Sequence, residues 1–101
     1  MSSQPNKREI IYFNVTGTIT EIGELLHIQR INLPDLYKRV YTLETADGQR
    51  LFPEIRNVKL KLLDKNQIQE GDLVRVEFSF EGSQRGDKRY NNIYTNNIEK
   101  V

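Results

Sequence analysis

The chain has 101 residues, of which 37% are hydrophobic, and this is enough for one hydrophobic core and one domain. Its 15 lysine and arginine residues face 14 aspartate and glutamate residues, so the net charge of +1 excludes a whole-molecule field that would attract nucleic acid or an anionic membrane. The lack of cysteine excludes disulfides, thiolate metal sites and cysteine nucleophiles.

The first eight residues are polar and basic, and they lack the apolar segment of a signal peptide. No stretch of the sequence approaches the roughly 20 apolar residues that a membrane-spanning helix needs. We therefore expect a flexible polar tail over residues 1–8, one folded domain over residues 9–101, a cytoplasmic location and no membrane partner.

The N-terminal part of the domain carries a strand pattern. Residues 9–22 alternate between apolar and polar side chains, which predicts a long, half-buried strand. Gly17 in its middle predicts a bulge or a tight bend. Residues 23–36 are expected to form a long connection that is partly strand-like over residues 25–31 and ends in a Leu-Pro-Asp turn signal.

A hairpin is predicted next. Residues 37–45 are rich in β-branched and aromatic side chains and predict the second strand. The Asp-Gly pair within residues 46–49 is a strong hairpin signal, so the third strand is expected to begin at residues 50–52. Pro53 marks an edge or a bulge of this strand.

The C-terminal half begins with an ambiguous segment, residues 57–69, in which we expect strand to about Leu60 and then a short helix. Residues 72–81 alternate cleanly and predict a fourth strand. Its inward-pointing members are expected to be Val74, Val76, Phe78 and Phe80. A charged, glycine-rich loop is predicted over residues 82–89, followed by a last strand over residues 90–101.

The order of these elements predicts an all-β fold: a five-stranded OB-fold Greek-key barrel with a short helix between strands 3 and 4. Residues 62–67, with their apolar contacts, would form the helix that covers one open end of the barrel. Another small barrel or a two-sheet sandwich is the competing interpretation.

Two stretches carry a resemblance to a known family. Residues 37–45 are one, and the other runs from the Gly-Asp-x-Val-x-Val motif at residues 71–76 to the Tyr-Asn-Asn-Ile motif at residues 90–93. Together they resemble a bacterial family of small, uncharacterised OB-fold proteins that is similar to the bacterial single-stranded DNA-binding protein. The resemblance spans most of residues 14–100 and implies an OB fold and binding to single-stranded nucleic acid.

The chain also departs from the bacterial single-stranded DNA-binding protein. It has no tryptophan, and it lacks the long acidic, glycine-rich C-terminal tail that recruits replication partners in that protein. This departure argues against a housekeeping role in replication, and an accessory role in a phage, plasmid or mobile element fits the sequence as well.

Single-strand binding requires exposed aromatic faces, on which bases stack, close to cations that meet phosphates. In an OB fold the second and third strands and the neighbouring loops form that surface. Residues 55–63 hold three cations and no acid, the clearest local excess in the chain. The candidate nucleic-acid-binding residues are Tyr37, Lys38, Arg39, Phe52, Arg56, Lys59, Lys61, Arg85, Lys88, Arg89 and Tyr90.

Each candidate also has a purely structural interpretation. Phe52 beside Pro53 fits a core position as well as a groove, and Lys59 and Lys61 fit the solvated face of a strand. The cations of residues 85–89 fit an ordinary charged loop. Tyr41 has the same strand parity as Leu43 and is expected in the core.

The sequence offers little for catalysis. His27 is the only histidine, and the carboxylates form no paired motif. Gly82 and Gly86 are not followed by the lysine and hydroxyl pair of a phosphate-binding loop. We therefore expect a protein that is not an enzyme, with no catalytic residue, no metal site and no cofactor.

Two hypotheses follow from the sequence. The first is a nucleic-acid-binding module that prefers single-stranded DNA or RNA with little sequence specificity, its rings stacking bases and its cations neutralising phosphates. The second is a protein-interaction or assembly module, favoured by the near-neutral charge and by the acids Glu77 and Glu81. Val40 and Thr42, or an open edge near Pro53, would then supply a subunit contact, and a homo-oligomer is compatible with both hypotheses.

Overall fold

The structure is a computed structural model that describes residues 9–101, so the tail predicted over residues 1–8 lies outside the described residues. Seven strands, one short 3₁₀ helix and one short α-helix follow one another in this part of the chain. They are β1 (Phe13–Ile22), β2 (Leu26–Ile28), β3 (Leu36–Thr45), β4 (Arg50–Leu51), β5 (Glu54–Arg56), the 3₁₀ helix (Asn57–Leu60), α1 (Lys61–Lys65), β6 (Leu73–Arg85) and β7 (Lys88–Lys100).

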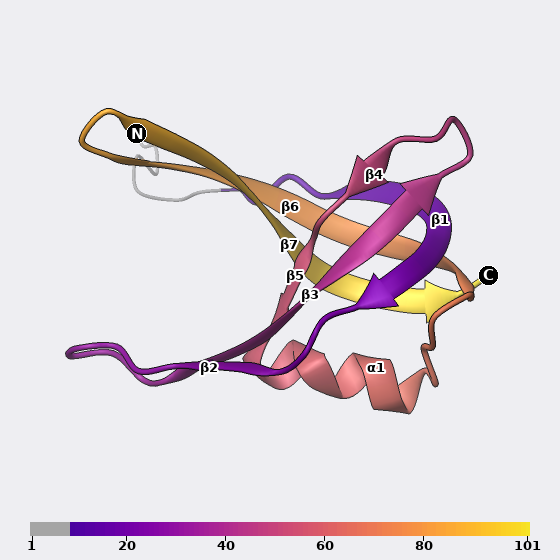
Figure 1. Ribbon diagram of the computed structural model, residues 1–101, viewed down its shortest axis with the longest axis horizontal. Helices are drawn as coiled ribbons and strands as arrows, with labels where there is room; N and C mark the ends of the chain where they lie inside the picture. The colour runs from indigo at the N-terminus through magenta and orange to yellow at the C-terminus, as the bar shows by residue number, and fades with distance from the viewer. Residues whose placement is uncertain (1–8) are drawn as a thin grey trace, which may run out of the picture.

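Five of the strands close into a barrel (Figure 1). The order around the barrel is β1, β6, β7, β5 and β3, and β3 pairs again with β1. All of these pairings are antiparallel except that of β5 with β7, which is parallel and consists of the single residue pair Glu54 and Tyr94 within the described chain. The predicted five-stranded barrel, with its helix between the third and fourth barrel strands, is confirmed.

The core follows from the alternation of apolar side chains along the strands. Inward positions of the barrel strands bury Ile19, Leu43, Ile55, Val76 and Ile98 completely. Tyr41 is buried with them, as its parity predicted, and its hydroxyl hydrogen-bonds the hydroxyl of Thr95.

The 3₁₀ helix and α1 lie beneath one end of the barrel (Figure 1). Leu60, Leu62 and Leu63 pack against the core from there. The strand predicted to continue to about Leu60 was wrong, because extended pairing ends at Arg56 and Asn57 has a φ of 50°. A residue with positive φ breaks an extended strand, and the chain turns into helix at that point.

Gly17 does not form the predicted bulge. The register of β1 against β3 shifts instead between Ile19 and Glu21. A Cβ atom at Gly17 would lie 2.7 Å from the backbone oxygen of Glu44, so the glycine permits a close approach of β1 to β3.

Two hairpin arms extend from the barrel and project toward the same side in Figure 1. One arm is formed by β2 and the first residues of β3. The other is the outer part of β6 and β7, whose pairing continues to Arg85 and Lys88 around a turn at Gly86, so the loop predicted over residues 82–89 was wrong. Seven residues of β6 extend past its last pair with β1, a length of roughly 20 Å.

Phe80 corrects the predicted inward row of the fourth strand. Val74, Val76 and Phe78 are buried, whereas Phe80 is 53% exposed. The reason is that β1 stops pairing with β6 at Phe13 and Phe78, so within residues 9–101 the barrel wall formed by β1 does not extend as far as Phe80.

Candidate nucleic-acid interface

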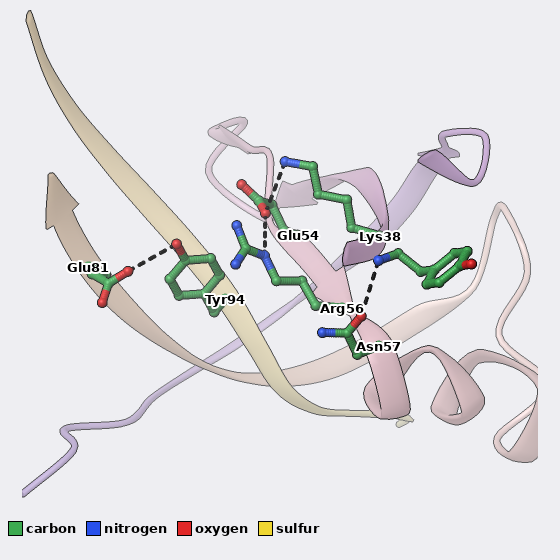
Figure 2. Close-up of polar contacts among 7 residues, drawn as sticks. Lys38, Glu54, Arg56, Asn57, Glu81 and Tyr94 are labelled. Atoms are coloured by element: carbon green, nitrogen blue, oxygen red, sulfur yellow. Dashed lines mark hydrogen bonds and ion pairs between the residues drawn. The ribbon is translucent and has the colours of Figure 1, made fainter. Parts of the chain in front are cut away.

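A polar cluster lies on the outer surface of the barrel where the two arms begin, and we call it the saddle. Four strands contribute to it, and the 3₁₀ helix adds a lysine at its rim. Its residues are Lys38, Glu54, Arg56, Lys59, Glu81 and Tyr94. Figure 2 shows the side chains of Lys38, Glu54, Arg56, Glu81 and Tyr94 in one continuous row.

Strand register explains why these residues meet. Lys38 pairs with Arg56 across β3 and β5, and Glu54 pairs with Tyr94 across β5 and β7. Paired residues point to the same face of a sheet, and Glu54 and Arg56 share a face because they are two positions apart. The cluster is therefore a consequence of how the barrel closes.

The contacts within the saddle are specific (Figure 2). Lys38 Nζ lies 3.3 Å from Glu54 Oε1, and Arg56 Nε donates to the same oxygen at 2.8 Å. The Arg56 guanidinium lies 4.4 Å from the centre of the Tyr94 ring, a cation–π arrangement. The Tyr94 hydroxyl donates to Glu81 Oε1 at 3.1 Å.

The phenol of Tyr94 is held in its neutral form. Partial burial raises its pKa above the ordinary value, the charge of Arg56 lowers it, and the hydrogen bond to Glu81 raises it again. Beside this ring is a shallow cavity of about 140 Å³, which Lys59 and Thr95 also line. The saddle thus combines three cations, two carboxylates and one partly exposed ring.

The first arm carries a pair of stacked rings. His27 and Tyr37 are paired across β2 and β3, and their rings are parallel within 8° at a centroid distance of 4.4 Å. His27 Nε2 contacts Asp35 Oδ2 at 2.8 Å, and the backbone N–H of Tyr37 donates to Asn57 Oδ1 at 3.1 Å. Because Tyr37 is 41% exposed, it keeps a surface that a ligand can reach.

The tip of the second arm carries the other basic group. Arg85 and Lys88 are the last residue pair of β6 and β7, and Tyr90 is exposed two residues further along β7. Lys88, Tyr90 and Tyr94 have the same parity and therefore line one face of β7, whereas Arg89 points to the opposite face.

Three of the candidate residues belong neither to the saddle nor to the groups on the two arms. Arg39 is half-buried, and its guanidinium donates to the backbone oxygen of Gly23 at 2.8 Å. Lys61 is exposed on α1, beneath the barrel. Phe52 is 59% exposed, but it lies in a hollow that contains the side chains of Glu21, Glu44 and Glu70.

Three residues of the saddle are absent from the candidates that the sequence indicated, and of these Glu81 was named only for the competing hypothesis. Tyr94 could have been found from its parity, because it faces the same side of the last strand as Tyr90. Glu54 could have been found from its position two residues before Arg56, which places both on one face of a strand. Glu54 and Tyr94 come together in the saddle only because β5 pairs with β7, and no local sequence pattern indicates that pairing.

No group of three metal-binding side chains is found within residues 9–101. In the same range no helix is long and apolar enough to span a bilayer.

Solved structures share this architecture. The mitochondrial single-stranded DNA-binding protein Rim1 of S. cerevisiae superposes with a TM-score of 0.63 at 13% identity, covering 92% of this chain and 97% of that chain. The barrel is an OB fold. A small single-stranded DNA-binding protein from Streptomyces coelicolor matches with a TM-score of 0.50 at 10% identity, covering 93% of this chain and 96% of that one.

A third OB-fold structure is the dimeric N-terminal domain of the PriB protein from Thermoanaerobacter tencongensis. It matches with a TM-score of 0.50 at 11% identity, covering 89% of this chain and 94% of that chain. No protein-family model and no curated protein matches the sequence. At these identities the likeness shows the fold alone.

Proposed function

We propose that this chain is a non-enzymatic module that binds single-stranded nucleic acid with little dependence on base sequence. The observation that carries the proposal is that Arg56 and Lys59 lie beside the Tyr94 ring at the base of both arms, with Lys38 joined to Arg56 through Glu54. Cations beside a partly exposed ring are what sequence-tolerant single-strand binding requires. Two of the three solved OB folds above, Rim1 and the Streptomyces coelicolor protein, are single-stranded DNA-binding proteins.

The proposed path of the strand crosses the saddle from one arm to the other. Tyr37 would stack a base on the first arm, and Tyr90 would stack a base on the second arm, near the cations of residues 85–89. Between the arms, Lys38, Arg56 and Lys59 would meet phosphates. The kinship with a bacterial family that the sequence motifs indicate remains a prediction.

The double variant Arg56→Ala/Lys59→Ala tests this proposal. On single strands each lost phosphate contact reduces the slope of log K against log salt by about 0.7, so this variant should bind more weakly and with a slope about 1.4 smaller. Fluorescence anisotropy with a labelled thymidine oligonucleotide at several salt concentrations measures both quantities.

The matched control is Arg75→Ala/Lys65→Ala, which removes the same charge from positions outside the saddle on β6 and α1. If the control and the test variant lose affinity and slope equally, the saddle is not the binding surface. A duplex of the same sequence is expected to bind more weakly than the single strand.

Self-association is the second proposed function, and a different observation favours it. An apolar strip formed by Ile10, Ile11, Phe13 and Phe80 is exposed beside the inner part of the second arm, with exposed fractions of 63%, 68%, 46% and 53%. These residues line a hollow of about 770 Å³. Exposed apolar surface of this kind marks interaction sites.

The subunit contact expected at Val40, Thr42 or Pro53 has less support, because Pro53 is buried and the other two are half-buried.

A further inference from the structure

Glu54 occupies a position in the saddle that resembles that of a bound phosphate. One of its oxygens, Oε1, contacts both Lys38 Nζ at 3.3 Å and Arg56 Nε at 2.8 Å. The side chain of Glu54 is only 13% exposed, and those of Lys38 and Arg56 are 18% and 33% exposed. An anionic oxygen shared by an ammonium and a guanidinium group is also how these cations bind a phosphate oxygen.

Arg56 also covers the ring that a base would need. Its guanidinium lies over one face of Tyr94 at 4.4 Å, while the Tyr94 hydroxyl is bound to Glu81. In the free protein the Arg56 guanidinium and the Tyr94 ring are therefore already engaged in a cation–π interaction with each other. A base can stack on this face of Tyr94 only after Arg56 has moved.

We propose that Glu54 is an internal competitor of the nucleic-acid phosphates and sets the affinity of the saddle. When a strand binds, a phosphate oxygen replaces Glu54 at Lys38 and Arg56, and a base replaces the guanidinium on the Tyr94 ring. This inference rests on the proposed function, since it describes how the same surface takes up its ligand. Glu54 acts through the two cations and is a positioning residue that opposes binding.

The competition has a consequence for the strength of binding. Each phosphate contact at Lys38 or Arg56 must replace an existing ion pair, so the observed affinity is the difference between two similar interactions. Removing the charge of Glu54 leaves both cations free for the ligand. Affinity and salt dependence should then increase together, which is the opposite of what loss of a binding residue produces.

The test compares Glu54→Gln with the unaltered protein in oligonucleotide titrations at several salt concentrations. The glutamine has nearly the same size, so the packing of the half-buried site is kept. Affinity for a thymidine oligonucleotide should rise about threefold to tenfold, and the slope against log salt should become steeper by up to about 1.4. The matched control is Glu99→Gln, which changes the net charge equally at an ion pair with Arg75 that is not part of the saddle.

A second measurement needs no substitution at Glu54. The Arg56 Nε–H signal in nitrogen-15 NMR reports the bond to Glu54 in the free protein, and it should move when the oligonucleotide is added. Unchanged or weaker binding by Glu54→Gln, or the same increase in Glu99→Gln, overturns the inference and leaves the proposed function standing. An Arg56 signal that does not move while the oligonucleotide binds also overturns it. If the unaltered protein binds no oligonucleotide, both the proposed function and this inference are wrong.

Discussion

The hydroxyl of Tyr41 lies inside the barrel, where it hydrogen-bonds the hydroxyl of Thr95, itself 5% exposed. Burial raises the pKa of Tyr41 well above its ordinary value, so the folded protein keeps this phenol neutral. The stability that follows is present below the phenol pKa of about 10 in unfolded chains and is lost as the pH rises toward the folded value. Alkaline unfolding should therefore depend on this residue.

Tyr41→Phe tests the buried pair. The substitution leaves the Thr95 hydroxyl without its partner in the core, which should lower the free energy of unfolding by about 1–3 kcal/mol. The double variant Tyr41→Phe/Thr95→Val removes both polar groups and should recover part of the loss. Urea unfolding followed by circular dichroism measures all three differences, and equal stability of Tyr41→Phe and the unaltered protein would contradict this account.

At the scale of the elements, the alternation of apolar and polar side chains predicted the strands correctly wherever one face of the strand is covered by the core. The strand predicted over residues 37–45 matches β3, and the inward row of β6 holds from Val74 to Phe78. The predictions were wrong where contacts with other parts of the chain, and not the local alternation, determine the structure. Phe80 continues the alternation of its strand but lies past the end of β1. Residues 58–60 continue a strand-like alternation but follow Asn57, which has a positive φ.

Gly17→Ala tests the contact between β1 and β3. A Cβ atom there would meet the Glu44 backbone oxygen at 2.7 Å and Leu43 at 3.0 Å, so the backbone of one strand must shift. We expect a loss of about 1–3 kcal/mol, measured by thermal or chemical unfolding. Gly82→Ala is the matched control, because a Cβ atom in that arm has its nearest neighbour at 3.9 Å, and it should change stability little. Comparable losses in both variants would show that close packing at Gly17 is not the cause.

The candidate site was predictable in part. The local excess of cations over residues 55–63 identified Arg56 and Lys59 because it needs no knowledge of the fold. Glu54 and Tyr94 were missed because their proximity depends on a pairing between residues 40 positions apart in the sequence. The stacking of His27 on Tyr37 was missed for a similar reason, since it requires the short pairing of β2 with β3.

At the scale of the whole molecule, a net charge of +1 conceals an uneven distribution. Cations concentrate at the saddle and at the tip of the second arm. The hollow that holds Phe52 lies away from the arms, and it is lined by three glutamates, Glu21, Glu44 and Glu70, and by one cation, Arg50. A near-neutral total therefore does not exclude an electrostatic ligand, because fields near a surface depend on local charges.

A variant of the apolar strip tests whether the whole molecule self-associates through this surface. Ile11→Ser/Phe80→Ser replaces two exposed apolar side chains, and it should shift an assembled species toward the monomer of 11.9 kDa. Size-exclusion chromatography with light scattering over a range of protein concentrations measures the change. Leu33→Ser, at an exposed position outside the strip, is the control and should leave the mass distribution unaltered. A monomer at every concentration before any substitution would exclude assembly through this strip.

The closure of the barrel has a consequence for motion. β5 and β7 are joined by one residue pair in the described chain, whereas β6 and β7 are paired along twelve. The seam with the fewest backbone bonds is the place where the ring opens at least cost. Its two residues, Glu54 and Tyr94, belong to the saddle, so a molecule seated there would bridge the seam and hold the two halves of the ring together.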